Sequence, residues 1–519
     1  MIFRSRHPDI DIPENLSLPD FIFQDIDSFV DKPALVDGPS GRGLTYGELY
    51  RDICRFARGL HQQGFASGDV FAIYCPNLPE YAVVFYGVAM LGGINTTINP
   101  LYTVDELARQ LNDANAKYLL TVPVFLDNAQ AAARQSNVES VFVIGEAEGA
   151  SAYSSLLQDE GELPRVPINP LEDIVVLPYS SGTTGMPKGV MLTHYNLIAN
   201  VCQFRNIAAI TERDNLIGIL PFFHIFGMVV LMAYGLLQKT TLVTMPRFDL
   251  EQFLQLMQDY EITRAFLVPP IVLALAKNPL VDNYDLSALK VITCGAAPLS
   301  KEVTQVCGDR LDCVVGQGYG MTEMSPATNL DDIDPGKVKA GSIGPIMPNT
   351  EAMIVDIDSG DALGCNQQGE YWVRGPQRMT GYLNRPEATA ESIDDEGWYH
   401  SGDIGYIDED GYVFIVDRVK ELIKYKAMQV APAELEALLL SHEAIIDAAV
   451  IPCPDEEAGE IPKAFVVTNG ELEADEIMAF VAGRVAPHKK IRALEFIDEI
   501  PKSPSGKILR RLLVERDRA

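Results

Sequence analysis

The stretch that decides the fold combines hydroxyl-bearing residues, glycines and one lysine: Tyr179-Ser180-Ser181-Gly182-Thr183-Thr184-Gly185-Met186-Pro187-Lys188-Gly189-Val190. Such a run suits a triphosphate better than a hydrophobic core. The preceding residues, Ile174 to Leu177, are typical of a buried strand, and Tyr195 to Val201 predict the start of a helix. A loop between a strand and a helix lies where an α/β sheet presents backbone N–H groups to anions. We therefore predict the phosphate-binding loop of an ATP-using enzyme.

The predicted loop is not a Walker A loop, which requires Gly, four residues and then Gly-Lys-Ser/Thr. The spacing from Gly182 to Lys188 differs, and Gly189 stands where the magnesium-binding hydroxyl would be. A P-loop NTPase is therefore disfavoured. A flexible surface loop is the alternative for an arbitrary segment rich in Gly, Ser and Thr. The full twelve residues favour phosphate binding.

The composition is that of a globular protein with an ample core: 519 residues, 47% of them apolar and 22% charged. This length predicts at least two domains. The formal net charge of −31 repels phosphate backbones and anionic lipid, so a nucleic-acid or electrostatic membrane-surface role is disfavoured. Acidic residues and proline follow the first six residues, which predicts no signal peptide and a cytoplasmic protein. The oligomeric state, monomer or homodimer, stays open.

The segment Ile217 to Leu237 carries no charge except on His224 when that residue is protonated, and it is long enough to be considered as a membrane-spanning helix. However, Pro221, Gly227 and Gly235 interrupt it, and no cluster of lysine or arginine flanks it. We therefore predict the wall of a pocket and no integral membrane span.

Eight cysteines are scattered along the chain, at positions 54, 75, 202, 294, 307, 313, 365 and 453. They form no C-x-x-C pair and no spacing typical of metal ligands. Reduced, buried thiols are therefore expected.

Apolar runs of strand length alternate with helical patterns along most of the chain. These runs are Val70 to Tyr74, Tyr118 to Val122, Val141 to Ile144, Ile174 to Leu177, Thr241 to Met245, Ala265 to Val268 and Val291 to Thr293. Such alternation predicts parallel sheets covered by helices. In addition, Thr103 and Glu106 form a capping box, which predicts a helix start before Leu107.

Beyond about residue 340, short strands and turns such as Glu370 to Arg374 and Tyr412 to Val416 predict a β-rich subdomain. Pro432 at a first helical position predicts a helix over Ala433 to Leu440. The predicted fold is α/β. Residues 1–417 form a large N-terminal domain of two α/β subdomains plus the β-rich subdomain. Residues 418–519 are expected to form a small α+β C-terminal domain.

A second glycine-rich motif reads Gly316-Gln317-Gly318-Tyr319-Gly320-Met321-Thr322-Glu323, shortly after Gly295-Ala296-Ala297-Pro298. Its small residues let a flat adenine approach the backbone, and the ring of Tyr319 can stack on that adenine. Thr322 can bond a phosphate, and Glu323 can hold magnesium. A tight turn at the end of a strand is the alternative.

Three charged motifs follow. In the first, Trp398-Tyr399-His400-Ser401-Gly402-Asp403 precedes Arg418, and a carboxylate with a guanidinium can bond both ribose hydroxyls. The others are residues 417–436 and Pro501-Lys502-Ser503-Pro504-Ser505-Gly506-Lys507-Ile508. Each alone fits a solvated charge run. All five motifs in this order favour a nucleotide site.

Together the five motifs resemble those of acyl-CoA synthetases of the adenylate-forming superfamily, from about residue 20 to Lys507. The segments Val268 to Lys277 and Tyr284 to Ser287 are most similar to 4-coumarate:CoA ligases and their luciferase relatives. The resemblance implies an ATP-dependent carboxylic acid:CoA ligase that uses Mg²⁺. In this family the carboxylate attacks the α-phosphorus of ATP, and CoA then displaces AMP. The resemblance also implies that the C-terminal domain is mobile and rotates between these half-reactions, with a hinge near Lys420. The implied substrate is a hydroxycinnamate-like aromatic or a fatty acid.

The resemblance also implies roles for single residues. Lys507 neutralises the carboxylate and the α-phosphate, Lys424 contributes to thioester formation, and His224 lines the acyl site. Thr322 and Glu323 complete the catalytic set, and Thr184 and Glu323 are the implied magnesium ligands. The implied nucleotide- and CoA-binding residues are Ser180, Ser181, Gly182, Thr183, Thr184, Gly185, Lys188, Gly295, Ala296, Ala297, Pro298, Gln317, Gly318, Tyr319, Gly320, Met321, Thr322, Asp403, Arg418, Lys420, Lys426, Ala427 and Gln429.

The sequence departs from the family pattern at three positions. Ala427 stands where glycine is usual, and its methyl group is expected to narrow the channel for the pantetheine arm of CoA. Phe226 and Val230 replace a tyrosine and a small polar residue, so the acid pocket is expected to be more apolar. Unsubstituted aromatic or aliphatic acids should then compete well with hydroxycinnamates. No acidic residue stands near His224, which argues against an amino-acid substrate.

Two other functions stay open. The enzyme can pass acyl-AMP to another acceptor, by luciferase-type oxygenation or to a carrier protein. A non-catalytic nucleotide-binding regulator would have lost its catalytic lysine, whereas Lys188 and Lys507 are both present.

Overall fold

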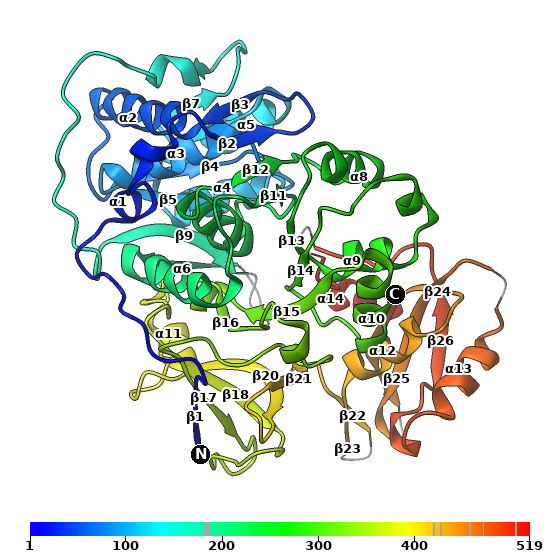
Figure 1. Cartoon of the computed structure of the whole chain (residues 1–519). Coiled ribbons are helices and arrows are strands. Elements are labelled where there is room, and N and C mark those ends of the chain that lie inside the picture. The colour runs from blue at the N-terminus through cyan, green and yellow to red at the C-terminus, as the bar shows by residue number, and fades with distance from the viewer. Residues whose placement is uncertain are drawn as a thin grey trace.

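The computed structural model describes residues 1–180, 187–418, 421–425, 428–455, 458–470, 472–503 and 506–518. Within these ranges the chain forms four sheets, which occupy different regions of the molecule (Figure 1). Two eight-stranded sheets with their helices make up the blue-to-green part, and two five-stranded sheets lie in the yellow and the orange-to-red parts. The fold class predicted from the sequence is confirmed.

The first sheet has a parallel centre and an antiparallel edge, because β10 pairs antiparallel with both β9 and β19. Across the sheet, the strands of the described chain are β19 (Gly381–Tyr382), β10 (Lys188–Thr193), β9 (Ile174–Ser180), β5 (Ile94–Thr97), β4 (Val70–Ile73), β6 (Ala116–Thr121), β7 (Ser140–Val143) and β8 (Ser151–Ala152). The helices between them are α2 (Tyr46–Gln62), α3 (Pro79–Met90), α4 (Val104–Asp113) and α5 (Leu126–Ala133). All four side chains of β4 are buried, as expected for a central parallel strand.

The second sheet is parallel through its middle and draws β2 and β3 from the N-terminal part of the chain. Its order is β16 (Ala327–Leu330), β15 (Val314–Gly320), β14 (Val291–Cys294), β13 (Arg264–Leu267), β11 (Asn215–Gly218), β12 (Thr241–Thr244), β2 (Pro33–Asp37) and β3 (Gly43–Thr45). The helices of this region are α1 (Leu18–Ile22), α6 (His194–Ala208), a π-helix (Phe226–Ala233), α7 (Tyr234–Leu237), α8 (Leu250–Asp259), α9 (Pro269–Lys277) and α10 (Lys301–Leu311).

The third and fourth sheets are smaller, and the third is antiparallel. It contains β1 (Ile2–Arg4), β17 (Glu351–Val355), β18 (Gly369–Arg374), β20 (Tyr399–Ile407) and β21 (Val413–Arg418), with α11 (Pro386–Ser392) beside it. The fourth contains β23 (Met428–Val430), β22 (Ile423–Tyr425), β25 (Gly459–Thr468), β24 (Ile445–Asp455) and β26 (Ala493–Phe496). Its helices are α12 (Pro432–Leu440), α13 (Ala474–Ala482) and α14 (Arg510–Arg518). The domain boundary at residues 417 and 418 stays a prediction.

The strands predicted from apolar runs are present as β4, β6, β7, β9, β12, β13 and β14. The capping box is also confirmed: the Thr103 hydroxyl accepts a hydrogen bond from the N–H of Glu106, whose carboxylate accepts one from the N–H of Thr103. Helix α12 begins at Pro432 as predicted. Local signals therefore determined these elements correctly.

The helix start predicted at Tyr195 to Val201 is confirmed by α6, but the strand that precedes this helix was not predicted. Residues Lys188–Thr193 form β10, which places Lys188 opposite Ser180 on β9. Helix α6 begins only at His194, where a second capping box between Thr193 and Asn196 fixes its first turn. The backbone N–H groups of β10 are used by strand pairing, so the helix start lies one strand away from the predicted loop.

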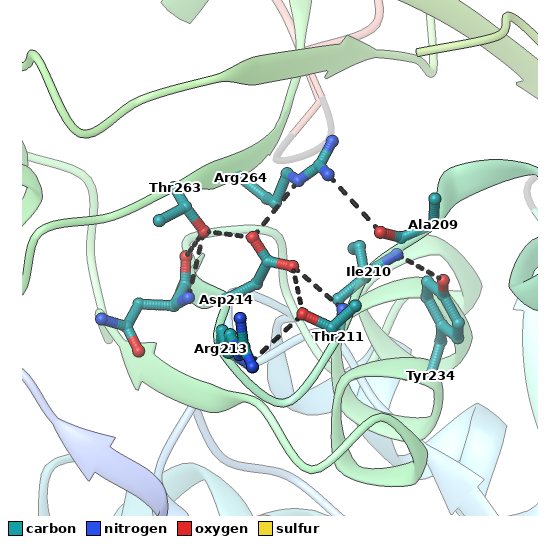
Figure 2. Close-up of polar contacts among 9 residues, drawn as sticks. Ala209, Ile210, Thr211, Arg213, Asp214, Tyr234, Thr263 and Arg264 are labelled. Carbon is teal, nitrogen blue, oxygen red and sulfur yellow. Dashed lines mark hydrogen bonds and ion pairs between the residues drawn. The ribbon is translucent and has the colours of Figure 1, made fainter.

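Asp214 fixes the beginnings of two central strands of the second sheet (Figure 2). One carboxylate oxygen accepts hydrogen bonds from the Thr263 hydroxyl at 2.7 Å and from Arg264 Nε at 3.4 Å, and the other accepts from the Thr211 N–H at 2.9 Å. Arg264 also donates to the carbonyl of Ala209, just after α6. Burial alone would raise the pKa of Asp214, but these hydrogen bonds and the Arg264 guanidinium hold that pKa below its ordinary value.

We expect Asp214→Ala to lower the free energy of unfolding at pH 7 by about 3 kcal/mol, because it leaves the Arg264 guanidinium without its buried partner. The lowered pKa means that Asp214 stabilises the fold above about pH 4, and this contribution is lost as the pH falls further. Chemical denaturation at pH 7 and at pH 3 measures both effects. The exposed control Asp309→Ala should stay within about 0.5 kcal/mol of wild type. Equal losses in the two variants would contradict the assignment.

No helix in the described ranges of the chain has the length and hydropathy needed to cross a membrane. The apolar segment considered above instead contains the end of β11, the π-helix and α7. The side chains from Met228 to Leu236 are buried within the protein core. This segment is therefore part of the core, and its predicted role as the wall of a pocket stays a prediction.

Candidate active site

The candidate site lies where the first and second sheets meet. Strand β15 of the second sheet ends at Gly320 and continues into a short 3-10 helix, η6 (Thr322–Met324). Strands β9 and β10 of the first sheet contact η6. The ends of the phosphate-binding stretch and the second glycine-rich motif, far apart in sequence, are therefore neighbours.

Tyr382 of β19 joins the lysine of the first motif to the acid of the second. Its hydroxyl donates a hydrogen bond of 2.8 Å to Oε1 of the buried Glu323. The ammonium of Lys188 lies over its ring, 4.8 Å from the ring centre. The face of one aromatic ring thus holds a cation, and the hydroxyl of the same side chain holds an anion. This arrangement suits a ligand that carries both negative phosphates and a metal ion.

The glycines of the second motif permit close backbone approach. A side chain at Gly320 would place its Cβ 2.1 Å from the carbonyl oxygen of Pro326, so only glycine fits there. A Cβ at Gly318 would meet Leu330 at 3.3 Å, which is tight but tolerable. The side chain of Gln317 accepts from the N–H of Leu299 and donates to the carbonyl of Ser342. Gln317 therefore supports the wall of the site from behind.

The segment Gly295 to Pro298 follows β14 beside the second motif. A Cβ at Gly295 would lie 2.9 Å from the ring of Phe226, so the glycine makes room for that ring. Phe226 also packs edge-to-face with Phe266, with ring centres 6.4 Å apart. Ala296 has a φ of +71°, a conformation that costs energy for alanine, and Ala296 and Pro298 are exposed.

Asp403 and Arg418 form an ion pair across β20 and β21, at 3.2 Å between Oδ1 and Nε. The Tyr319 hydroxyl donates a hydrogen bond to Oδ2 of Asp403. Burial raises the pKa of Asp403, and the Arg418 guanidinium opposes that rise. The carboxylate is thus oriented by two partners from the second and third sheets. Tyr319 holds Asp403 and packs on Tyr371, so its predicted stacking on adenine stays a prediction.

His224 and Lys507 come together from positions far apart in the sequence. The ring nitrogen Nδ1 of His224 accepts a hydrogen bond from the N–H of Phe226 at 3.3 Å, which leaves the proton of the neutral ring on Nε2. Burial and the nearby Lys507 ammonium lower the pKa of His224 to about 4. Burial and the Arg418 guanidinium lower the pKa of Lys507 to about 8. A neutral imidazole therefore lies close to a desolvated cation.

The loop that carries Lys507 is held against the second sheet. Gly506 has a φ of +79°, and a Cβ there would be 3.3 Å from the side chain of Val268. The N–H of Lys507 donates to the Ser503 hydroxyl at 3.1 Å, which closes the turn. In this conformation the loop before α14 therefore places Lys507 at the candidate site.

Several predicted residues are placed elsewhere or lie outside the described residues. Lys424, on β22, has an exposed side chain, and its N–H donates to Glu460, so it does not join Lys507. The backbone of Gln429 pairs with that of Lys424. Residues outside the described ranges are Ser181, Gly182, Thr183, Thr184, Gly185, Lys420, Lys426 and Ala427. Ser180 ends β9, and Met321 and Thr322 lie half-buried at the start of η6.

Sequence reasoning missed two groups of residues at this site. Tyr382 was missed because its link to Lys188 and Glu323 depends on pairing between β10 and β19. Its only local signal is a glycine-tyrosine pair. Glu421 lies within one of the quoted motifs and Arg510 just beyond another, and the ion pair between them was not predicted. Charge runs alone do not reveal which members are paired.

The chain is similar to known proteins over nearly its whole length. Residues 22–383 match the family model described as AMP-binding enzyme, and residues 434–507 match the AMP-binding enzyme C-terminal domain. A protein named 4-coumarate--CoA ligase 2, from Nicotiana tabacum, is 45% identical over 522 residues, which cover 98% of this chain and 96% of that protein.

Two solved structures have similar folds over nearly the whole chain. The anthranilate CoA ligase AuaEII in complex with anthranoyl-AMP has a TM-score of 0.90 and 25% identity, with 98% of both chains covered. ATP-bound MatB from Rhodopseudomonas palustris has a TM-score of 0.88 and 27% identity, with 97% of this chain and 99% of that chain covered.

Proposed function

Since this chain belongs to the family of AMP-binding enzymes and is an ATP-using, AMP-forming CoA ligase related to the 4-coumarate--CoA ligases, we propose that it works in two steps. The carboxylate of the acid first attacks the α-phosphorus of ATP, and pyrophosphate leaves. The thiolate of CoA then attacks the carbonyl carbon of the acyl-adenylate, and AMP leaves. The single observation that supports the first step most strongly is the Lys507 ammonium beside His224, on a loop that packs against Val268.

In this proposal Lys507 binds the carboxylate and the α-phosphate together, because a desolvated ammonium stabilises the negative charge that concentrates there. Neutral His224 lines the acid site and can donate a hydrogen bond from Nε2 without adding charge. The oriented Asp403 carboxylate accepts hydrogen bonds from the ribose hydroxyls. Lys188 binds the outer phosphates as a point charge.

For Mg²⁺, Glu323 fits the chemistry of the ion, because a carboxylate oxygen is a ligand that Mg²⁺ prefers. The second proposed ligand, Thr184, lies outside the described residues. Bound Mg²⁺ would neutralise charge on the phosphates and the departing pyrophosphate. The contribution of this chain is to hold the Glu323 carboxylate in one orientation through the Tyr382 hydroxyl.

We expect Tyr382→Phe to lower kcat/KM for ATP in adenylate formation by about tenfold, since a hydrogen bond to a charged group is worth about 1.5–3 kcal/mol. The Mg²⁺ concentration needed for half-maximal rate should rise as well. Pyrophosphate release at varied ATP and Mg²⁺ measures both quantities. Tyr399→Phe is the matched control, because its hydroxyl lies 3.5 Å from that of Tyr382 and has no hydrogen bond to Glu323. An equal loss in the control would contradict the role of Tyr382.

For the CoA step we propose that Lys424 and Gln429, on the paired strands β22 and β23, face the adenylate after the fourth sheet has moved. Lys424 is exposed in the present conformation, so it is available for that second role. Lys420 would be the hinge and Ala427 would border the pantetheine channel. If the extra methyl group narrows the channel, Ala427→Gly should lower KM for CoA.

For the acid we propose an unsubstituted aromatic or aliphatic side chain, with hydroxycinnamates as weaker or equal competitors. Phe226 presents an apolar edge beside Gly295, and Val230 is fully buried in the π-helix. A phenol hydroxyl buried against these groups would lose its hydrogen bonds to water, which is unfavourable. A steep preference for coumarate would overturn this proposal.

The reducing interior of the cell is the proposed compartment. All eight cysteines are free thiols, and burial raises the pKa of Cys294 and of Cys75, which keeps them unreactive.

The test is a mass-spectrometric assay with ATP, Mg²⁺ and a panel of fatty acids, benzoates and cinnamates, each with and without CoA. Acyl-CoA from one class of acid supports the proposed ligase and identifies its substrate. Acyl-AMP that accumulates despite CoA would indicate another acceptor and contradict the second step. A lack of pyrophosphate release with every acid would contradict both steps.

A further inference from the structure

The nucleotide side of the candidate site borders a cluster of charged side chains. In this cluster two arginines form ion pairs with the nearby carboxylates. Arg418 pairs with Asp403, as described above. Arg510, near the start of α14, donates to Glu421, to Glu436 at 2.6 Å and to the carbonyl of Val450 at 3.2 Å. All three guanidinium nitrogens of Arg510 are therefore engaged.

Lys507 lies three residues before Arg510 and is the cation of this cluster that remains within the described part of the chain. Among the described residues, its Nζ makes no ion pair and no hydrogen bond. The charged and titratable groups that act on it are His224 from the second sheet, Asp403 and Arg418 from the third, and Glu421 and Arg510 from the region of the fourth. Glu421 is near enough to favour the charged form of Lys507, although its carboxylate is bonded to Arg510.

We propose that Arg510 is a positioning residue that withholds Glu421 from Lys507, so that the Lys507 ammonium stays uncompensated until substrate arrives. The proposal rests on the role given above to Lys507. Without Arg510, the Glu421 carboxylate would be available to pair with Lys507, whose charged form it already favours. A lysine already neutralised by its own protein would attract the substrate carboxylate and the α-phosphate less strongly.

Arginine suits this task for a geometric reason. Its planar fork donates in several fixed directions at once and thereby holds two carboxylates and one carbonyl. A lysine at position 510 would keep the charge but not this directional geometry, and its ammonium would have to share its donors among the same acceptors. Glu436 is 7% exposed and accepts a hydrogen bond from the N–H of Val450, which fixes its carboxylate. A lysine at position 510 would therefore stay paired with Glu436 more readily than with Glu421. Arg510→Lys therefore releases Glu421 selectively.

The experiment measures the titration of Lys507 in the full-length enzyme without ligands. Competitive labelling with acetic anhydride across a pH series, followed by peptide mass spectrometry, gives the apparent pKa of that lysine. Adenylate formation is measured separately as pyrophosphate release. The variants are Arg510→Lys, Glu421→Gln, the double variant, and Arg511→Lys as control. Arg511 is exposed on the same helix and pairs only at the surface with Glu515 among the described residues.

In Arg510→Lys we expect the apparent pKa of Lys507 to rise by about one unit, which corresponds to about a tenfold change in equilibrium, and kcat for adenylation to fall about tenfold. Adding Glu421→Gln should return both quantities towards wild type. A misfolded protein would not be repaired by the loss of a second ion-pair partner. Glu421→Gln alone keeps the pair between Arg510 and Glu436, and there the pKa of Lys507 should fall. Arg511→Lys should match wild type in both assays.

The proposal is overturned if the pKa of Lys507 is unchanged in Arg510→Lys or in Glu421→Gln. It is also overturned if the double variant is no closer to wild type than Arg510→Lys. If the pKa shifts and recovers as expected while adenylation never changes, the charge separation is supported and the proposed role of Lys507 in adenylation fails. The two failures are therefore distinguishable.

Discussion

Replacement of Lys507 by methionine is expected to lower the rate of adenylate formation by about 100- to 1,000-fold, the usual loss when one preorganised charge-stabilising group is removed. Methionine keeps much of the length and apolar character of the lysine stem, so the packing of the loop against Val268 should survive. Conversion of a preformed acyl-adenylate to the thioester should change far less. Separate assays of the two half-reactions with the same enzyme preparation measure this difference.

The pH dependence provides a second measurement of the same residue. The pKa of Lys507 is lowered to about 8, and the protonated form is the one that binds anions. In the free enzyme, kcat/KM for ATP in adenylation should therefore fall as the pH rises through about 8. The guanidinium introduced by Lys507→Arg stays charged throughout this range. In that variant kcat/KM should therefore no longer fall at alkaline pH, even if its rate is low. The exposed control Lys490→Met should keep both the rate and its fall at alkaline pH. If kcat/KM still falls at alkaline pH in Lys507→Arg, the titration of another group causes that fall.

Replacement of Asp403 by alanine is expected to raise KM for ATP by about 100-fold. Removing one partner of a buried, hydrogen-bonded charge pair costs about 2–5 kcal/mol. The variant loses the acceptor for the ribose hydroxyls and the acceptor of the Tyr319 hydroxyl. It also leaves the Arg418 guanidinium uncompensated near Lys507, which should lower the pKa of that lysine further. Steady-state kinetics and binding of ATP in the absence of acid measure these effects.

Two further variants separate the causes of that loss. Asp403→Asn keeps the shape and a hydrogen-bond acceptor but removes the charge, so its KM should lie between wild type and Asp403→Ala. Asp410 lies in the turn after the same strand and is exposed, and it pairs with Lys339 at the surface. Asp410→Ala should leave KM for ATP within about twofold, because surface ion pairs contribute little. An unchanged KM in Asp403→Ala would contradict the assignment of the ribose site.

The parts of the fold that could be predicted are those specified by neighbouring residues. The apolar run at Val70 predicts a strand because both faces of a central parallel strand are covered, and β4 is there. The capping box at Thr103 needs only four consecutive residues, and it is present. In contrast, β10 was missed because its residues become a strand through pairing with β9 and β19. Pairing partners are not visible in a short window of sequence.

The same distinction holds for the candidate site. The motifs around Tyr319 and Asp403 were predicted to belong to one site, and the structure brings those two residues into contact. Lys507 lies near His224 only because of where the fourth sheet is placed, and no local sequence pattern specifies that placement. The pairing of Arg510 with Glu421 and Glu436 likewise depends on how α14 packs. The sequence therefore predicted the candidate reacting groups and missed the residues that hold them.

The sheets of this protein are completed by strands that lie far apart along the chain. Strand β1 pairs with β17, so that Arg4 lies beside Glu351, 347 residues further on. The first sheet receives its last strand, β19, only at Tyr382. On a ribosome that adds about 5–20 residues per second, the N-terminal strand waits about 20 to 70 s for its partner. Throughout that time the growing polypeptide exposes an unpaired sheet edge, which is a site for aggregation. The nascent chain should therefore depend on chaperones until most of its length has been translated.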